Sequence, residues 1–334
     1  MGEKKQMKQV VFFKDISKIS IALNQFDLNE FSKQKTLVKL HMGEVKNKYF
    51  PKPAFVKHII DELKHISSDP FLYDTTVLYN SPRRFKKGYQ QVARLHGFTQ
   101  KNVGCPVHVD ETGEKTTIGE YEYEVGSMLH QTKHIIAISH VKGHISSGMG
   151  GAIKNFGMGG VTRNTKKQIH DACRPVYSEK NCTYCGRCET LCPFNAIKIK
   201  DDSWIYNKRR CFGCGVCIEN CPEHALSNEE SDFQYQLACA AKACLQHKKV
   251  IYINEIKRIS KSCDCDPSSG PIICPDIGYV VSDDPVAIDA TSLDLKKKEK
   301  KDIFIKENHV NPRKQIQFGE EIGLGKSSYE LITL

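Results

Sequence analysis

Short runs of apolar residues alternate with segments of helical spacing along much of the chain. Five runs rich in β-branched or aromatic residues are expected to form strands, at residues 8–14, 36–41, 76–79, 135–139 and 249–253. Helical spacing predicts helices over residues 55–63, 87–96 and 233–247. Such alternation favours an α/β fold in which helices are layered on a mostly parallel sheet.

Both periods disappear between residues 175 and 228, where eight cysteines gather. Residues 162–170 and 228–235, on either side, have helical character. We therefore predict that residues 1–174 form the first part of an α/β domain and residues 229–334 its second part. Residues 175–228 would be a small inserted α+β module of the ferredoxin type.

The cysteines of this segment form a duplicated motif. The two runs are Cys182-x2-Cys185-x2-Cys188-x3-Cys192-Pro193 and Cys211-x2-Cys214-x2-Cys217-x3-Cys221-Pro222. In bacterial ferredoxins with this spacing, three cysteines bind one [4Fe–4S] cluster and the fourth binds the other. The motif predicts two clusters, one on Cys182, Cys185, Cys188 and Cys221, the other on Cys211, Cys214, Cys217 and Cys192.

Two other interpretations of the motif are open. C-x2-C pairs also build tetrahedral zinc sites, although those sites use two pairs rather than two triples with a trailing Cys-Pro. A pair of clusters can also serve only to hold a fold together. An electron relay explains two adjacent clusters better than either.

Composition places the protein among ordinary globular chains. It has 334 residues, of which 40% are hydrophobic and 26% charged. The first ten residues lack the apolar stretch of an export signal, and no apolar run approaches the roughly 20 residues needed to cross a bilayer. Fifteen cysteines in such a chain indicate metal or redox chemistry in a reducing cytoplasm.

The formal charge of +10 raises the question of nucleic-acid binding. The one dense basic run, residues 296–301, follows a helix expected to end near Leu295 and has no interleaved aromatic side chains for stacking on bases. We interpret it as a solvated lysine-rich face and expect no nucleic-acid partner. The remaining charge suits an acidic protein as electron donor or acceptor. The oligomeric state is left open.

Several motifs outside the cysteine-rich segment resemble the family catalogued as domain of unknown function 362. They are Lys39-x-His41-x-Gly43-Glu44, Asp74-Thr75, His96-Gly97-Phe98, His140-Val141-Lys142-Gly143-His144, the stretch Gly150 to Gly159, Cys263-Asp264-Cys265, Pro275-Asp276-Ile277-Gly278 and Asp284-Pro285-Val286-Ala287-Ile288-Asp289. The likeness runs from about Val10 to Leu295. It implies an iron–sulfur redox protein of largely anaerobic prokaryotic metabolism, and it implies no substrate.

A second candidate site follows the strand expected at residues 135–139. His140, Lys142 and His144 would lie at the carboxyl end of the sheet, where open α/β sheets bind ligands, and Lys154 follows in a glycine-rich stretch. That stretch fits neither a P-loop nor a dinucleotide fingerprint. Tight turns and surface hydrogen bonds are the alternative explanation for these residues.

Other loops could complete this site. Cys263 and Cys265 could chelate a metal or form a redox pair, or remain reduced structural thiols, while Asp74 and Asp289 could add carboxylates. The two lysines suit an anionic ligand better than a metal. The preferred hypothesis is an oxidoreductase whose clusters relay electrons to this site. The alternatives are a dedicated electron carrier and an accessory protein that activates another metalloenzyme.

Overall fold

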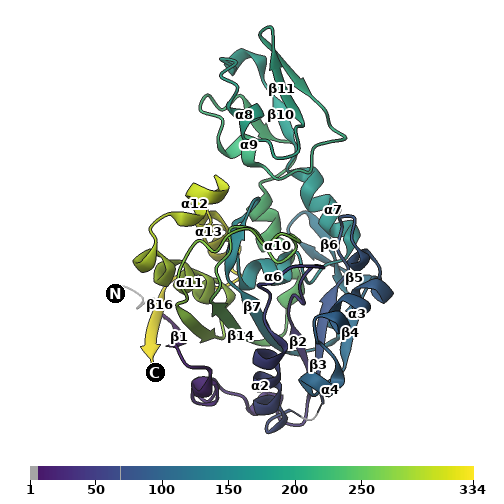
Figure 1. Ribbon diagram of the computed structural model, residues 1–334, viewed down its shortest axis with the longest axis vertical. Coiled ribbons are helices and arrows are strands. Elements are labelled where there is room, and N and C mark those ends of the chain that lie inside the picture. The colour runs from purple at the N-terminus through teal and green to yellow at the C-terminus, as the bar shows by residue number, and fades with distance from the viewer. Residues whose placement is uncertain (1–6, 68) are drawn as a thin grey trace.

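The computed structural model describes residues 7–67 and 69–334. The first six residues, part of the segment in which we expect no export signal, lie outside the described part. A single eight-stranded sheet runs through the body of the molecule (Figure 1). In spatial order its strands are β16 (Tyr329–Thr333), β1 (Lys8–Phe13), β15 (Gly278–Ser282), β14 (Lys249–Ile256), β7 (His134–His140), β2 (Lys35–Lys39), β3 (Asp69–Thr75) and β4 (Val107–Asp110).

The sheet is mostly parallel, as predicted. Strands β14, β7, β2, β3 and β4 all pair in parallel, and β15 alone runs antiparallel to both of its neighbours. At one edge β1 pairs in parallel with β16, so strands from the two ends of the chain lie side by side (Figure 1). The α/β class is therefore confirmed.

Helices cover both faces of the sheet because successive strand residues point to opposite sides. Leu37 and Ile135 belong to one apolar core, and their neighbours Val38 and Ile136 belong to the other. The first core is covered by α5 (Ser127–Gln131), α6 (Ala152–Gly157), α7 (Arg163–Ala172), α10 (Phe233–Leu245), α11 (Pro285–Glu299), α12 (Ile303–Asn308) and α13 (Arg313–Glu321). The second is covered by α1 (Ile19–Leu23), α2 (Pro53–Lys64), α3 (Lys86–Leu95) and α4 (Gln100–Val103).

Most predicted elements are present, and one strand was misplaced. The strand expected at residues 76–79 is instead β3, Asp69–Thr75, after which the chain leaves the sheet. The helical character expected from residue 228 begins only at Phe233, where the side chain of Asp232 caps α10. Helix α11 continues past Leu295, and Lys296 is buried, whereas the other lysines of the basic run are exposed.

Residues 175–228 protrude from one end of the molecule (Figure 1). The chain pairs with itself where it enters and leaves, through β10 (Pro175–Tyr177) and β13 (Leu226–Asn228). Each cysteine run continues into a single helical turn, α8 (Arg187–Thr190) or α9 (Val216–Glu219), and a hairpin of β11 (Ile197–Lys200) and β12 (Ser203–Tyr206) lies between the runs. Strands β7 and β14, which precede and follow this segment, are neighbours in the main sheet.

The remaining elements are small. Two further hairpins are β5 (Gly113–Ile118) with β6 (Tyr121–Gly126), and β8 (Lys142–His144) with β9 (Gly148–Gly150). Short 3₁₀ helices span Ile16–Lys18, Asn29–Phe31, Pro82–Arg84 and Glu179–Asn181. Among the described residues, no helix has the length and apolar character needed to cross a membrane.

Candidate functional site

The order of the strands creates a crevice at the carboxyl end of the sheet. From β2 the chain passes to α2 on one face, whereas from neighbouring β7 it passes to α6 on the opposite face. Open α/β sheets bind ligands where the connections diverge in this way. A cavity of about 900 Å³, counted with its solvent-open part, lies at this position.

The cavity brings together most of the residues that the sequence singled out. His140, Lys142, His144 and Lys154 all line it, as do Asp74 and Cys265. Scattering of these side chains over separate turns, the alternative explanation, is therefore wrong. Asp289 does not line the cavity.

Basic side chains dominate the cavity wall. Its cations are Lys39, Arg83, Lys142, Lys154 and Lys166, and the one carboxylate among its described lining residues is Asp74. Fully buried Lys39 donates to Asp74 Oδ1 (2.8 Å) and to Asn155 Oδ1 (2.9 Å). This excess of positive charge suits an anionic ligand.

Lys154 is the cation with most freedom to act on a ligand. Within the described part of the chain its ammonium group has no hydrogen-bond or ion-pair partner, and burial, together with nearby Lys142, lowers its pKa to about 7. Burial also lowers the pKa of Lys166 to about 7, although Lys166 donates to Thr75 Oγ1 (2.7 Å). Lys154 is partly buried, and an ammonium group that is withdrawn from much of the solvent without a partner is costly. An anion in the cavity would provide that partner.

Arg83 closes another side of the cavity through a buried network. Its guanidinium group donates to Tyr89 Oη (2.8 Å) and Tyr79 Oη (3.2 Å) and lies 3.5 Å from a carboxylate oxygen of Glu44. Arg83 is therefore part of the site. Arg84 is exposed.

His140 is held firmly in place. Nδ1 lies 2.9 Å from Asp264 Oδ1, and Nε2 lies 2.8 Å from the carbonyl oxygen of Lys257. Lys142 pairs with the other oxygen of Asp264 at 3.2 Å. Burial alone would raise the pKa of Asp264, but the adjacent His140 and Lys142 outweigh it and hold that pKa below its usual value. With both ring nitrogens engaged, His140 positions the loop of Asp264.

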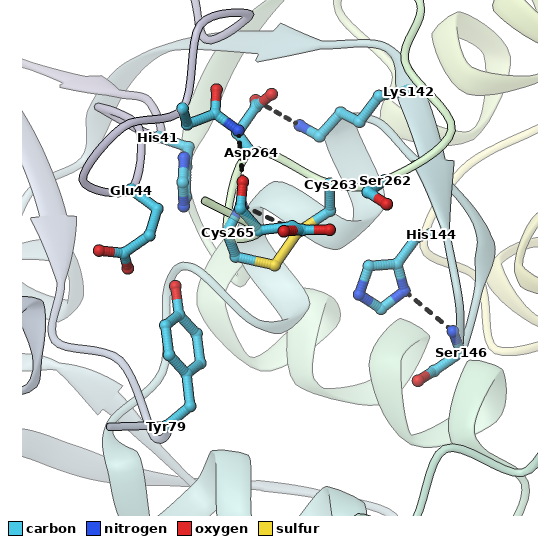
Figure 2. Close-up of a disulfide and its surroundings, with 12 residues drawn as sticks. His41, Glu44, Tyr79, Lys142, His144, Ser146, Ser262, Cys263, Asp264 and Cys265 are labelled. Atoms are coloured by element: carbon cyan, nitrogen blue, oxygen red, sulfur yellow. Dashed lines mark hydrogen bonds and ion pairs between the residues drawn. A yellow bond between two sulfur atoms is a disulfide. The ribbon is translucent and has the colours of Figure 1, made fainter. Parts of the chain in front are cut away.

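The hydrogen bonds of His144 define which of its ring nitrogens carries the proton. Nδ1 accepts a hydrogen bond from the backbone N–H of Ser146 at 3.2 Å (Figure 2) and another from that of Ser147, also at 3.2 Å. Burial, with a contribution from Lys154, lowers the pKa of the ring well below its ordinary value. The neutral ring that results carries its proton on Nε2.

Asp289 has a structural role instead of the predicted place in the site. Its carboxylate accepts from the backbone N–H groups of Ala152 (2.7 Å) and Ile153 (2.9 Å) and from Asn254 Nδ2 (2.8 Å). It thereby fixes the N-terminus of α6, the helix that carries Lys154. Burial raises the pKa of Asp289 to about 6.

Cys263 and Cys265 are joined by a disulfide at the edge of the cavity (Figure 2). Asp264 between them is the residue bound by His140 and Lys142, so the loop is anchored between its two sulfurs. One nitrogen of His144 and both sulfurs lie within 4.8 Å of one another. Among the described residues, this is the one group of three side chains whose ligand atoms are close enough together to hold a single metal ion. The two thiols predicted to be a metal ligand pair or a redox pair are therefore in the oxidised form.

The eight cysteines of the duplicated motif line two small cavities. One, of about 370 Å³ counted with its solvent-open part, is lined by Cys182, Cys185, Cys188 and Cys221. The other, of about 330 Å³ counted in the same way, is lined by Cys192, Cys211, Cys214 and Cys217. Each set thus combines three cysteines of one run with the last cysteine of the other.

The surroundings of these sulfurs fit an anionic cluster. Backbone N–H groups approach three of them, from Tyr184 to Cys182 (3.4 Å), from Ala196 to Cys192 (3.3 Å) and from Ala225 to Cys221 (3.2 Å). In each set the four cysteines surround a space and do not converge as ligands of a single ion would, an arrangement that fits the separate corners of a cubane. Hydrogen bonds to sulfur stabilise negative charge on such a centre.

Phe212 connects this region to the main cavity. It belongs to the wall of the cavity formed by Cys192, Cys211, Cys214 and Cys217, and also to the wall of the cationic cavity. Its ring lies 4.1 Å from that of His170, centroid to centroid. The contact of Phe212 with His170 joins segments about forty residues apart. The duplicated motif is a local pattern, so it gives no sign of a special role for Phe212.

Sequence reasoning missed several members of the site. Lys39 and His41 occur in the family motifs but were given no role, and Lys166 and His170 were noted only as part of a helix. A lysine next to Lys167, which is exposed, gives no signal of burial. The strand-end position of Lys39, directly after three apolar or β-branched residues, was the one available clue.

These features define a class of protein. It is an α/β protein that has a cationic cavity in the crevice between β2 and β7, with a cysteine-rich segment against that cavity. A model of the family described as domain of unknown function (DUF362) matches residues 36–294. The chain belongs to this family, in agreement with the resemblance seen in its motifs. A search of curated proteins finds no match for this chain.

Solved structures give distant likenesses. The lactate racemase apoprotein from Thermoanaerobacterium thermosaccharolyticum is 13% identical with a TM-score of 0.40, and the likeness covers 77% of this chain and 52% of that chain. A protein from Thermotoga maritima is 10% identical with a TM-score of 0.44, over 92% of this chain and 59% of that one. The chain thus spans little more than half the length of these proteins.

Proposed function

We propose that this protein is an iron–sulfur oxidoreductase that relays electrons between two [4Fe–4S] clusters and an anionic ligand in the cationic cavity. Cys182, Cys185, Cys188 and Cys221 would hold one cluster, and Cys192, Cys211, Cys214 and Cys217 the other. The observation that carries the proposal is the position of Phe212, in the wall of both the second cysteine cavity and the ligand cavity.

The bound clusters would supply one-electron transfer over a range of potentials set by their surroundings. The protein's own residues would do the rest. Lys154 and Lys166 would bind the anion, Lys142 and His140 would hold the Asp264 loop against it, and Arg83 with its tyrosines would close the far side. Buried charge of this kind, fixed before the ligand arrives, stabilises negative charge that develops during reduction.

Cys185 lines the other cysteine cavity, the one that Phe212 does not line, and it is exposed. Electrons from a partner protein could therefore enter at this cluster. The same exposure favours the second candidate, a dedicated electron carrier. The large cavity is more than such a carrier requires. An acidic partner and a cytoplasmic location remain predictions.

Analysis of anaerobically purified protein tests the proposal. We expect about eight iron and eight sulfide per chain and a signal of reduced [4Fe–4S] clusters in electron paramagnetic resonance. Addition of an anion that binds the cavity should shift that signal for the nearer cluster. Stoichiometric zinc without sulfide would contradict the cluster assignment, and clusters indifferent to every anion would favour the carrier.

A further inference from the structure

We infer that the Cys263–Cys265 disulfide is a redox-active group of the cavity, which opens to a dithiol by taking up electrons from the clusters. The inference rests on the proposed function and deepens it, because it names the first acceptor on the cavity side. Cys265 is in the cavity wall, partly accessible, whereas Cys263 is buried.

A continuous series of rings leads from the cysteine-rich segment to this disulfide. From Phe212 the centroid of the His170 ring is 4.1 Å away, that of Phe233 lies 5.1 Å beyond His170, and that of His144 lies 6.3 Å beyond Phe233. A nitrogen of His144 then lies within 4.8 Å of both sulfurs. Four side chains from four separate segments thus bridge the two redox groups without a gap.

The stoichiometry of the step fits two clusters. Opening the S–S bond consumes two electrons and two protons and gives two thiols. Two bound [4Fe–4S] clusters, each a donor of one electron, would together supply both electrons. The protons would come from solvent through the open cavity. The ring nitrogen of His144 that is not bonded to Ser146 lies on the side of the disulfide (Figure 2), so its N–H could pass them to sulfur.

The surroundings also favour reactivity of the reduced cysteines. Cationic Lys142 is bound to Asp264 between the two cysteines, and Lys154 lies across the same cavity. Positive charge beside a thiol stabilises the thiolate, the form that reacts in thiol–disulfide exchange.

A metal held by His144, Cys263 and Cys265 is the competing explanation. It would need a lone pair on the nitrogen that faces the sulfurs. Nδ1 of His144 already accepts from the N–H groups of Ser146 and Ser147 and from Ser147 Oγ (3.0 Å). Metal binding through Nε2 would move a proton to Nδ1 and break these hydrogen bonds, so the geometry favours a disulfide over a metal site.

Mapping of alkylated thiols in the anaerobic holoprotein tests the inference. The protein is oxidised, treated with iodoacetamide and digested, and the peptide that contains Cys263 and Cys265 is measured by mass spectrometry. We expect no alkylation before reduction and two alkylated thiols after reduction with photoreduced deazaflavin. Cys265→Ser should abolish the gain of two alkylated thiols on reduction and leave cluster reduction unchanged. Cys274→Ser, at a buried cysteine outside the disulfide, should keep the gain of two alkylated thiols.

A pair of phenylalanine variants tests the route. Phe212→Leu should slow the appearance of the two thiols several-fold while the clusters are reduced at the normal rate. Phe194→Leu is the matched control, because Phe194 lines the same cysteine cavity and packs on Phe212 at 5.2 Å but does not reach the ligand cavity. Equal rates in the two variants would overturn the route.

Three results would overturn the redox-active disulfide itself. They are two alkylated thiols already in the oxidised protein, a peptide that stays protected while both clusters become reduced, and a stoichiometric metal lost in Cys263→Ser. Absence of iron and sulfide would instead mean that the proposed function fails. Iron present with a disulfide that stays closed would refute the present inference alone.

Discussion

The backbone carbonyl of Gly213 lies 3.2 Å from Nδ1 of His170, so the second cysteine loop is bonded directly to the helix that borders the ligand cavity. The two backbones also approach each other closely at this point. A Cβ atom added at Gly213 would lie 1.8 Å from the carbonyl oxygen of His170. This contact places Phe212, the residue before Gly213, between the two cavities.

Gly213→Ala should therefore disturb the joint between the cysteine-rich segment and α7. Gly215→Ala is the matched control, because Gly215 has a similar positive φ (+76° against +73°) but nothing within 4 Å of the added Cβ. Both variants carry about the same backbone strain, roughly 1 kcal/mol. We expect Gly213→Ala alone to slow electron transfer from the clusters to the cavity and to increase protease cleavage between residues 172 and 178. Identical behaviour of the two variants would contradict this account.

In the proposed ligand sets, the last cysteine of each run binds the cluster of the other run. Replacing that cysteine should therefore damage the cluster that is farther away in sequence. Cys221 belongs to the second run, yet it lines the cavity of Cys182, Cys185 and Cys188. Cys221→Ser should thus damage that cluster, and Cys192→Ser should damage the one bound by Cys211, Cys214 and Cys217. Paramagnetic resonance of each variant, with iron counted per chain, distinguishes the two losses. Loss of the cluster nearer in sequence would show the assignment to be wrong.

Strand ends were the part of the site that the sequence could predict. A strand expected at residues 135–139 placed His140, Lys142 and His144 at the carboxyl edge, because parallel strands share that edge. The misplaced strand shows the limit of this reasoning. Thr76 and Val77 have high strand propensity, but the backbone N–H of Val77 bonds to the carbonyl of Arg83 and the chain turns away.

The sequence could not predict which way the side chains of a fully buried helix point. Nearly every residue from Pro285 to Leu295 is buried, so α11 has no polar face to show which way Asp289 points. The contact of His170 with Gly213 depends on how an inserted segment folds back on its host, and no local pattern encodes that. Long-range packing, not local propensity, completes the cavity.

Asp289→Ala should destabilise the fold more than an ordinary surface change. It leaves the N–H groups of Ala152 and Ile153 and the amide of Asn254 without an acceptor in the core. The expected loss in the free energy of unfolding is about 2–4 kcal/mol. Asp294→Ala in the same helix, which removes a half-exposed ion pair with Arg313 and a hydrogen bond from Tyr329 Oη, should cost less, about 1 kcal/mol. Chemical denaturation of both variants measures the difference, and equal losses would refute the role of Asp289.

Anion affinity should fall as the pH rises from 6 to 8. Lys154 and Lys166 have a pKa of about 7, so both lose their charge over this range. The fixed charges that face Lys154 are Lys142 and Lys39 against Asp264 and Asp74. His41 and His144 have a pKa well below the ordinary value because they are buried, and burial lowers that of His170 to about 4, so these rings stay neutral throughout.

Sulfate is the suitable probe, because its charge does not change in this range. Each lysine that must be protonated weakens binding about tenfold between pH 6 and 8. Lys154→Met should weaken binding roughly 10- to 100-fold at pH 6, through loss of a charged hydrogen bond, and should flatten the pH dependence. Lys167→Met, an exposed neighbour of Lys166, should change neither. Calorimetric titration gives the affinities, and a pH profile that Lys154→Met leaves as steep as before would remove Lys154 from the anion site.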